Sequence, residues 1–579
     1  MSTADYVVLA FYLAGIFFVG LLFTRKNKSS EDMFAAGGQS PWWTSGLSAF
    51  MTMFSANTFV VWGGIAYKYG MVAVTINLMY GVAALLVGFF VAGKWKKLGI
   101  KTPAEFIQLR YGSGALHFYT WFMTLFRMIG TAGSLYALGI IFVGLLTDGQ
   151  ASISMLNITI AVFGGIVVIY TMFGGLWAVL MTDVLQFIVL NLAVLFVVPL
   201  AFIKVGGVKA FVSQAPESFF APIGGQYTWF FLAGWCAIHF FMIGAEWAFV
   251  QRFICVPSPK DARKSTYLFG ALYLTSPLLW LLPPMLWRIQ SPIPEGATAE
   301  EIRILAENAY ILSCKSVLPA GMVGLMLAAM FSATASMVSS QLNVFSGVFT
   351  NDIYKPLKGG ILSDNHMVWT GRVFTIILGG ILILIAMAIP FMGGAEKVIV
   401  SLTELMVVGL LAPTLWGLFS KKVNSPAVWI TAIVTFAMGF LVRFGLSKDG
   451  FIADVDYLAS LAGWVQAHGA ETKTFTGVIL PLFVLTVIQL LSRKPSAGYA
   501  RVQAYQAAAE SLEATGKIKA SRLPAIIVAW SIGACGLLMS VMALLDKQSP
   551  IVTGIFAIVL FLMAAAIGLF VWFSREESA

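Results

Sequence analysis

A single carboxylate, Asp183, lies within a long apolar stretch at residues 177–203. Inside hydrocarbon such a group is costly unless it is paired, protonated or bound to a cation. No Lys or Arg lies within helical reach of Asp183 on its own segment. We therefore expect a cation, a proton or a cluster of hydroxyls from another segment to compensate its charge.

A cluster of hydroxyls occurs in the apolar stretch 316–349, which carries Ser332, Thr334, Ser336, Ser339 and Ser340. The last three are spaced i, i+3 and i+4, so they share one face of a helix. Hydroxyl, carbonyl and carboxylate oxygens are hard ligands that suit an alkali or alkaline-earth cation. Serines in such a helix also bond their own i−4 carbonyls and allow close packing. The residues alone leave both interpretations open.

A third polar interruption lies in the stretch 43–70, where small and hydroxyl residues run from Ser48 to Gly63 and Gly64 and include Asn57 and Thr58. An interrupted helix needs such residues, because unwound backbone must find hydrogen-bond partners away from lipid. Small residues equally serve close helix packing. We expect an interruption here.

The elements that position these groups are membrane helices. The 579 residues are 59% hydrophobic and only 11% charged, with a mean hydropathy of +0.87, which excludes an ordinary soluble protein. Apolar runs of about 20 residues, long enough to cross the bilayer, predict an all-α polytopic protein of about fifteen spans. These are 6–24, 43–70, 71–93, 115–146, 152–173, 177–203, 228–250, 266–287, 316–349, 368–391, 397–419, 426–446, 474–492, 524–545 and 551–573.

The net charge of +10 lies in short loops rather than on one face, so it indicates topology and not nucleic-acid binding. The basic clusters that fall on one side are Arg25 to Lys28, Lys94 to Lys101, Lys260 to Lys264, Lys355 and Lys358, Lys421 and Lys422, and Arg493 to Arg522. The opposite loops carry Asp148, Glu295, Glu300, Glu301, Asp454 and Asp456. The basic side is predicted to be cytoplasmic, with the N-terminus outside and the C-terminus cytoplasmic.

Two loops, 288–315 and 493–522, are long enough to hold a surface helix each. The first is expected outside, as a lid over the core or as a solvated connector, and the second as a cytoplasmic linker. The four cysteines have no metal-ligand or redox spacing. We find no nucleotide loop, catalytic triad or metal cluster in the sequence, so it predicts no enzyme. The absence of a targeting peptide favours a bacterial inner membrane.

Several motifs together resemble those of the sodium-solute symporters, a family that includes glucose, proline and sialic acid transporters. The motifs are Gly174-Gly175-Leu176-x-Ala178-Val179-x-x-Thr182-Asp183-x-x-Gln186, Val250-Gln251-Arg252, Thr102-Pro103-x-Glu105-Phe106, and the stretch from Gly324 ending in Phe349-Thr350-Asn351-Asp352-Ile353-Tyr354. The resemblance covers residues 35 to 420.

The resemblance implies a five-plus-five inverted-repeat fold in which the first helix of each repeat is discontinuous, here around Ser48 to Gly64 and Gly244 to Gln251. The domains expected from it are a leading helix and loop (1–35), a first repeat (36–205), an inverted second repeat containing the extracellular loop 288–315 (206–420), and four additional helices (421–579).

The resemblance also implies two cation sites. In family members the main sodium site takes backbone carbonyls and two adjacent hydroxyls, which align with Met51, Phe54, Ala333, Ser336 and Met337. The thioether of Met337 is a poor ligand for a hard cation, so this site is weakened. A second site used by some relatives aligns with Asp183, Ser336, Ser339 and Ser340, all of which are present, and we expect it to carry most of the coupling here.

Solute-binding candidates are polar or aromatic residues of the same helices. They are Asn57, Thr58, Asn77, Tyr80, Arg127, Glu246, Trp247, Thr403 and Glu404, with His239 a helix-packing residue. By resemblance, sugar transporters use polar residues near Asn77 and Glu246, and sialic acid transporters use an Arg near Arg127 to hold a carboxylate. Alternatively Arg127 and Glu246 neutralise each other.

These observations predict a secondary active transporter that couples sodium to a small polar solute, a sugar or a sugar acid resembling sialic acid. Its expected partners are the solute, sodium and the lipid bilayer, with no nucleic acid and a monomeric functional unit. A proton-coupled or cation-independent carrier is the alternative, suggested by Met337 and by the acids Asp183, Glu246 and Glu404. A membrane sensor is a third, disfavoured because 493–522 is too short for a signalling domain.

Overall fold

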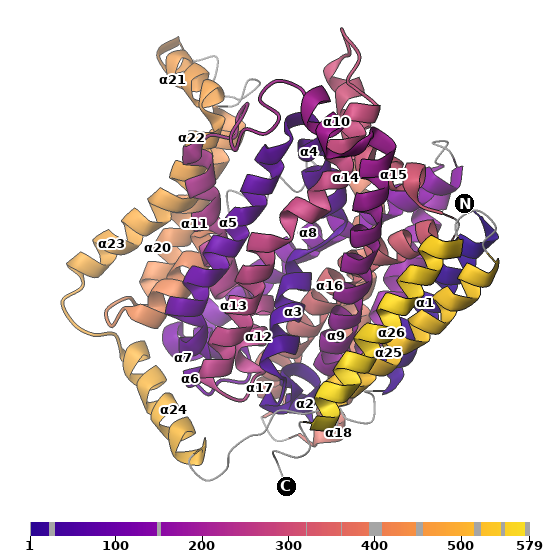
Figure 1. Ribbon diagram of the computed structural model, residues 1–579. Helices are drawn as coiled ribbons and strands as arrows, with labels where there is room; N and C mark the ends of the chain where they lie inside the picture. The colour runs from indigo at the N-terminus through magenta and orange to yellow at the C-terminus, as the bar shows by residue number, and fades with distance from the viewer. Residues whose placement is uncertain are drawn as a thin grey trace.

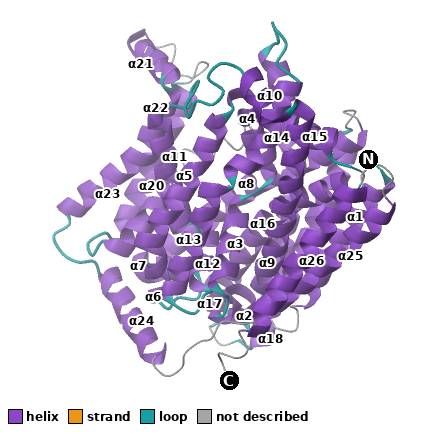
Figure 2. Cartoon of the chain, in the orientation of Figure 1, coloured by secondary structure: helices purple, strands orange, loops and turns teal. Residues whose placement is uncertain are grey.

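The computed structural model describes residues 2–22, 29–147, 152–319, 321–359, 362–392, 408–446, 456–513, 523–545 and 550–573. Within these ranges the chain forms helices and connecting loops and no strand (Figure 2). The prediction of an all-α protein is therefore confirmed.

The N-terminal part of the chain contains the long helix α9 and the helices before and just after it. They are α1 (Thr3–Leu22), α2 (Ser30–Ala35), α3 (Trp42–Met53), η3 (Thr58–Trp62), α4 (Gly63–Tyr69), α5 (Met71–Val87), η4 (Gly88–Ala92), α6 (Gly93–Lys97), α7 (Pro103–Tyr111), α8 (Ser113–Thr147), α9 (Ile153–Val205) and α10 (Gly207–Gln214).

The following helices run to the middle of the chain and beyond it. They are α11 (Trp229–Ala245), α12 (Trp247–Ile254), α13 (Pro259–Thr275), α14 (Pro277–Gln290), α15 (Ala299–Val317), α16 (Met322–Val348), η5 (Phe349–Tyr354), α17 (Lys355–Leu357) and α18 (Asp364–Ala388). The helix Val408–Phe419 precedes α20 (Ser425–Phe440), η7 (Leu441–Gly445), α21 (Asp456–Ala467), α22 (Gly469–Thr474), η8 (Phe475–Ile479), α23 (Leu480–Leu491), α24 (Ala497–Glu513), α25 (Leu523–Leu545) and α26 (Pro550–Phe573).

Among the described residues, six helices are long and apolar enough to cross a membrane alone, or up to eight if each of two bent pairs is one span, with shorter apolar helices besides. The 53 residues of α9 extend about 80 Å at about 1.5 Å per residue, more than twice the hydrocarbon thickness of about 30 Å. Two helices meet inside it across a kink at Gly175 (φ 57°, ψ −156°), between the predicted spans 152–173 and 177–203. The total of fifteen stays a prediction, because most of 397–419 lies outside the described residues.

Both predicted interruptions occur as bent helix pairs. The helix Trp42–Met53 is bent by 65° from Thr58–Tyr69, and Trp229–Ala245 by 53° from Trp247–Ile254. Extended residues form the two breaks: Phe54 (φ −87°, ψ 136°) and Glu246 (φ −69°, ψ 136°). Each break leaves backbone groups without helical partners inside the protein, where a ligand can reach them.

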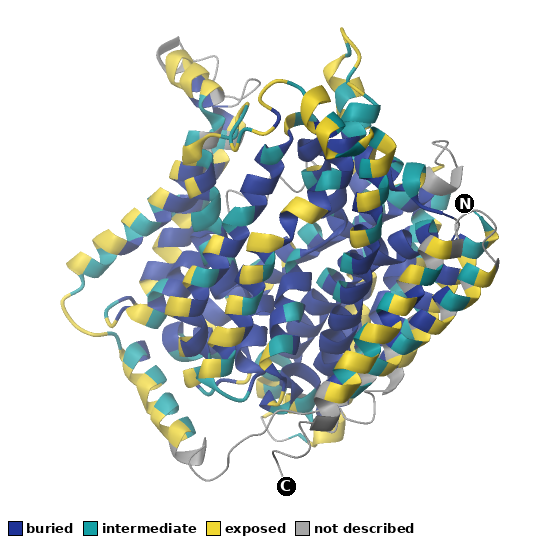
Figure 3. Cartoon of the chain, viewed as in Figure 1, coloured by how far each residue is buried: buried dark blue, intermediate teal, exposed yellow. Residues whose placement is uncertain are grey.

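Buried residues fill the centre of the molecule, and exposed ones lie mainly on peripheral helices such as α23 (Figure 3). The most enclosed span is α16, which packs against α9, α3, α8, α18 and α1. Asp5 of α1 ties the two helices together, because its Oδ1 accepts from the backbone N–H groups of Gly321 (2.8 Å) and Gly324 (2.9 Å).

Basic and acidic loops lie at opposite ends of the molecule. The basic clusters around α6, α17 and α24 are at the lower end in Figure 1, and α15 and α21, which carry Glu300, Glu301 and Asp456, are at the upper end. The two loops with expected surface helices, now α15 and α24, therefore lie at opposite ends of the molecule.

The helix α15 covers the second half of the first broken span, since it packs on η3 and α4. The rings of Phe59 and Tyr310 meet edge to face, 4.9 Å apart. Gly64 permits this approach, because a Cβ there would lie 3.3 Å from the backbone of Ala306. The glycine pair Gly63 and Gly64 thus serves close packing rather than the break itself.

Candidate ion and solute site

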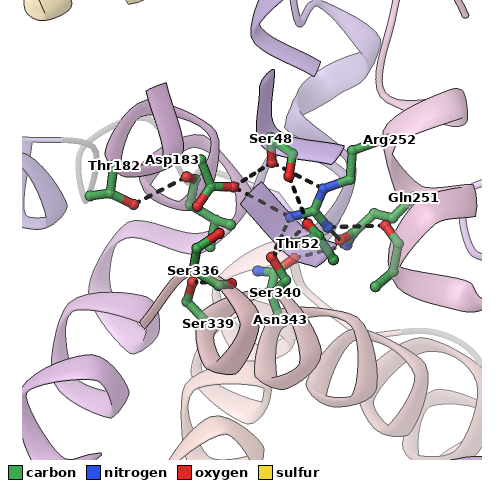
Figure 4. Close-up of polar contacts among 12 residues, drawn as sticks. Ser48, Thr52, Thr182, Asp183, Gln251, Arg252, Ser336, Ser339, Ser340 and Asn343 are labelled. Carbon is green, nitrogen blue, oxygen red and sulfur yellow. Dashed lines mark hydrogen bonds and ion pairs between the residues drawn. The ribbon is translucent and has the colours of Figure 1, made fainter. Parts of the chain in front are cut away.

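Four segments that are distant in the sequence, α3, α9, α12 and α16, meet around a buried polar cluster (Figure 4). Its members are Ser48 and Thr52 of α3, Asp183 of α9, Gln251 and Arg252 of α12, and Ser336, Ser339, Ser340 and Asn343 of α16. Since α3 and α12 each adjoin a helix break, the cluster joins both interrupted spans to the serine-rich helix.

Asp183 is fully buried and its charge is compensated by two other helices. Ser48 of α3 donates a hydrogen bond to Oδ2 of Asp183. The Nη2 atom of Arg252 lies 3.7 Å from the same oxygen, and both side chains are completely buried. The hydroxyl partner comes from α3 and not from the predicted cluster in 316–349, and the guanidinium from α12 was not predicted either.

The guanidinium of Arg252 donates hydrogen bonds to groups on three helices, α3, α12 and α16. Its Nε donates to Ser48 Oγ (3.1 Å) and its Nη2 to Ser340 Oγ. Its Nη1 donates to the Ala248 carbonyl and to Gln251 Oε1, both at 3.1 Å. A planar guanidinium with five donors can bridge three helices in this way, which an ammonium group cannot.

The predicted second cation site is therefore partly occupied by protein. Ser340 accepts from Arg252, and Ser339 donates to the Ser336 carbonyl of its own helix at 3.1 Å. Two buried oxygens, Asp183 Oδ1 and Ser336 Oγ, have no hydrogen-bond partner among the described residues. A carboxylate oxygen and a hydroxyl oxygen are the ligands a hard cation prefers, so this part of the cluster fits sodium.

The residues aligned with the main cation site lie at the first helix break and on α16. Met51, Phe54, Ala333 and Ser336 are all completely buried. The backbone N–H of Ala56, just after the break, donates to Thr334 Oγ1 (3.0 Å) and fixes the break against α16. The Met51 carbonyl accepts from the N–H of Phe54 (3.1 Å), and so keeps a lone pair for an ion.

Met337 links the predicted main site to the predicted solute side. Its sulfur accepts a weak hydrogen bond from Ser134 of α8 (3.6 Å), and Ser134 in turn accepts from the amide of Asn57 (3.1 Å). The thioether is thus engaged with a hydroxyl, in keeping with its low affinity for a hard cation.

On the solute side, Arg127 of α8 and Glu246 at the second break form an ion pair of 3.1 Å between Nε and Oε1. Gln341 of α16 donates to the same Glu246 oxygen at 2.7 Å. In the structure Arg127 and Glu246 therefore neutralise each other, which is the alternative that the sequence left open. Nη2 of Arg127 remains buried without a hydrogen-bond partner.

The other predicted solute residues are spread more widely. Thr58 is buried beside the first break, while the amide of Asn77 donates to the Ala73 carbonyl of its own helix (2.9 Å). Tyr80 packs against His239, with ring centroids 4.1 Å apart, and His239 is bonded to the Trp235 carbonyl at 2.8 Å. Trp247 is buried against Phe345. Thr403 and Glu404 lie outside the described residues.

The sequence analysis did not assign Arg252, Ser48, Gln341 or Ser134 to the site. Arg252 was visible in the Val250-Gln251-Arg252 motif, and the signal was an arginine inside an apolar segment, which requires a buried acid. Ser48 lies four residues before Thr52 on one face of α3, a spacing that indicates a polar helix face. Gln341 and Ser134 have no comparable signal in the sequence.

Helices broken midway and facing buried charged groups define a membrane transporter rather than an enzyme. The sequence pattern of the sodium:solute symporter family matches residues 33–434. The sodium/glucose cotransporter of Vibrio parahaemolyticus is 28% identical over 477 residues, covering 77% of this chain and 86% of that protein. The sodium/sialic acid symporter NanT of Aliivibrio fischeri is 26% identical over 510 residues, covering 84% and 92%.

A solved structure of a sodium-coupled sialic acid symporter in a substrate-bound outward-open state has the same fold. Its TM-score is 0.65 at 24% identity, covering 83% of this chain and 98% of that one. The chain belongs to the sodium:solute symporter family. It is an integral membrane protein, and its relatives are transporters and not enzymes.

Proposed function

We propose that this chain is a sodium-coupled symporter of a small polar solute, a sugar or a sugar acid. The observation that carries the proposal is the pair of unpartnered buried oxygens, Asp183 Oδ1 and Ser336 Oγ, on the two helices that pack against α3. Buried polar atoms are nearly always satisfied, so a cation that binds these free atoms gains the most. Named relatives that couple sodium to glucose and to sialic acid support the same proposal.

The site works by linkage. An ion held by Ser336 near the break and a solute held on the other side of the break share the segment from Met53 to Asn57. Binding of either stabilises the same arrangement, and the resulting coupling free energy is reciprocal. Inward movement of one positive charge adds about 2.3 kcal/mol per 100 mV of membrane potential.

The solute chemistry follows from Arg127. Its free Nη2 is a donor for a solute oxygen, and a carboxylate would take it with a charge-assisted bond. The ion pair with Glu246 means that an acidic solute must share the guanidinium, whereas a neutral sugar would bond to Glu246, Gln341 and Asn57. A sugar acid can bond to Arg127 through its carboxylate and to the other three residues through its hydroxyls, so it is the favoured solute.

A cation-independent carrier is the second candidate, favoured by Arg252. Because a tethered cation already lies beside Asp183, the charge there is compensated without a transported ion. A carrier of this kind does not bind sodium at Met337 and Ser340 at all, whereas the proposed symporter binds it more weakly there.

Uptake into proteoliposomes separates the two. Purified protein is reconstituted and assayed with labelled glucose and N-acetylneuraminic acid under an inward sodium gradient alone, an inward proton gradient alone, and neither. We expect uptake only with sodium, and loss of sodium stimulation in Asp183→Asn, which removes the charge but keeps one oxygen. Uptake that follows the proton gradient and ignores sodium contradicts the proposal.

The source membrane and orientation complete the proposal. The basic end, containing α6, α17 and α24, faces the cytoplasm of a bacterial inner membrane, and α15 faces outward, as the positive-inside rule requires. Each monomer contains a full set of ion and solute groups.

A further inference from the structure

An apolar groove opens on the side of the molecule, away from the ion and solute site. Its volume is about 440 Å³, within the range of about 300–1,000 Å³ typical of small-molecule pockets. Its walls come from α11, from the helix Val408–Phe419 with the residue that follows it, and from α23. The lining residues are Phe240, Phe241, Leu415, Trp416, Phe419, Ser420, Leu482 and Gln489.

The lining is suited to hydrocarbon and not to a polar solute. Its polar side chains are used within the protein: Trp416 Nε1 donates to Gln489 Oε1 (2.7 Å). Ser420 Oγ accepts from the backbone N–H groups of Lys422 (3.1 Å) and Val423 (3.2 Å). What remains exposed in the groove is mainly aromatic and aliphatic carbon.

Positive charge gathers where the two long walls end. The helix Val408–Phe419 leads through Ser420 to Lys421 and Lys422, and α23 ends at Leu491, just before Arg493 and Lys494. Lys94 of α6 reaches the same end, since its Nζ lies 3.6 Å from the centroid of the Phe419 ring that lines the groove.

These five cations, Lys94, Lys421, Lys422, Arg493 and Lys494, form no ion pair with an acid of the described residues. An apolar groove that ends in unpaired basic residues is complementary to a molecule with a hydrocarbon tail and an anionic head.

We propose that the groove is a binding site for an anionic phospholipid. One acyl chain lies between α11 and α23, and the headgroup phosphate is held by Lys94 together with Lys421 and Lys422. Basic residues next to a membrane-embedded groove recognise anionic lipids by this charge, and a zwitterionic lipid with the same chains lacks the net charge that the lysines select. The site does not depend on which ion or solute is transported.

The position of the groove gives the lipid a means to affect transport. Phe240 and Phe241 belong to α11, which runs into the break at Glu246 after Ala245. A chain packed against these phenylalanines supports the half of the broken span that precedes the break, so occupancy by lipid is expected to change the transport rate as well as stability.

The test measures lipid binding to the purified full-length protein. Delipidated protein in detergent is titrated with phosphatidylglycerol, with phosphatidylcholine carrying the same chains, and with inorganic phosphate, and the midpoint of thermal unfolding is followed. Bound lipid is counted by native mass spectrometry. We expect saturable stabilisation by phosphatidylglycerol at a much lower concentration than by phosphatidylcholine, and none by phosphate.

Two kinds of variant test the two halves of the site. Lys94→Gln should weaken phosphatidylglycerol binding by roughly fivefold, from about 1 kcal/mol per basic residue at a lipid surface. Lys421→Gln and Lys422→Gln should add to this loss. Lys209→Gln, an equal loss of charge on the exposed face of α10 at the opposite end, is the matched control and should bind as the parent protein does.

Leu482→Trp fills the groove while all the lysines remain, and should lower the affinity for both lipids. Equal affinity for the two lipids, equal stabilisation by phosphate, or unchanged binding in both Lys94→Gln and Leu482→Trp overturns the proposal. None of these outcomes depends on a transport assay. They therefore test the lipid site whether or not the proposed symport is correct.

Discussion

Arg252 of α12 lies 3.7 Å from the carboxylate of Asp183 in α9, and neither side chain is exposed to solvent. The two residues are 69 positions apart in the sequence and belong to opposite halves of the proposed repeat. A transported cation at Asp183 must therefore use the free Oδ1 while Arg252 keeps Oδ2, or Arg252 must move. In the second case α12, which follows the second break, responds to the ion.

Arg252→Gln should be strongly destabilising, because it leaves the Asp183 carboxylate buried and uncompensated. Loss of one partner of a buried ion pair costs about 3–5 kcal/mol. The double variant Asp183→Asn with Arg252→Gln should recover a large part of this cost. A double-mutant cycle on unfolding in detergent measures the coupling, and additive effects of the two single changes contradict a direct pair.

Met337→Ser should lower the sodium concentration needed for half-maximal uptake. The new hydroxyl supplies the hard oxygen that the thioether does not, beside Ser336 with its free Oγ. Met337→Leu is the control, since it keeps the size and has no ligand atom. The sodium dependence of uptake is the measurement, and equal half-saturation in all three proteins would exclude Met337 from the ion site.

Arg127→Lys should weaken binding of a carboxylated solute strongly, because a point ammonium cannot reproduce the planar fork of the guanidinium. Sodium-dependent solute binding to purified protein measures the change. Glu246→Gln serves as the companion variant: it frees Arg127 from its ion pair and should tighten binding of an acidic solute. Normal transport of a neutral sugar in Arg127→Ala, with no acidic solute transported by the parent, contradicts the carboxylate role.

Gly175→Ala should destabilise the protein by about 1–3 kcal/mol, because its backbone conformation (φ 57°, ψ −156°) is one that side chains rarely adopt. Gly165→Ala in the same helix is the matched control. A Cβ at Gly165 meets nothing within 4 Å, and alanine is the better helix former by up to about 1 kcal/mol. Equal unfolding midpoints of the two variants would contradict a strained kink.

Single cysteines should report the orientation in a background where the native cysteines are replaced. We expect Glu295→Cys, in the exposed loop before α15, to react with an impermeant maleimide in intact cells. Lys494→Cys, exposed after α23, should react only after the membrane is opened. Labelling of position 494 from outside would reverse the proposed topology of the C-terminal part.

The parts of the fold that depend on local composition were predictable. The first break follows from small and polar residues in an apolar span, whereas the second was expected only from the family resemblance. The kink at Gly175 lies between two predicted spans. Contacts between distant segments were not predictable. That Arg252 reaches Asp183, and that the sulfur of Met337 accepts from Ser134, depend on how α12, α9, α8 and α16 pack. A single sequence does not reveal how these helices pack against one another.

The attachment of Asp5 to the start of α16 sets a condition on biogenesis. Asp5 and Gly324 are 319 positions apart, which at about 5–20 residues per second of synthesis means that α1 is made on the order of 15–60 s before α16. During that interval the Asp5 carboxylate has Ser2 as a local partner, through its backbone N–H and its hydroxyl, both at 2.8 Å. The helix α1 must therefore remain in place in the bilayer, with Oδ1 of Asp5 still without its final partners, until α16 has been inserted.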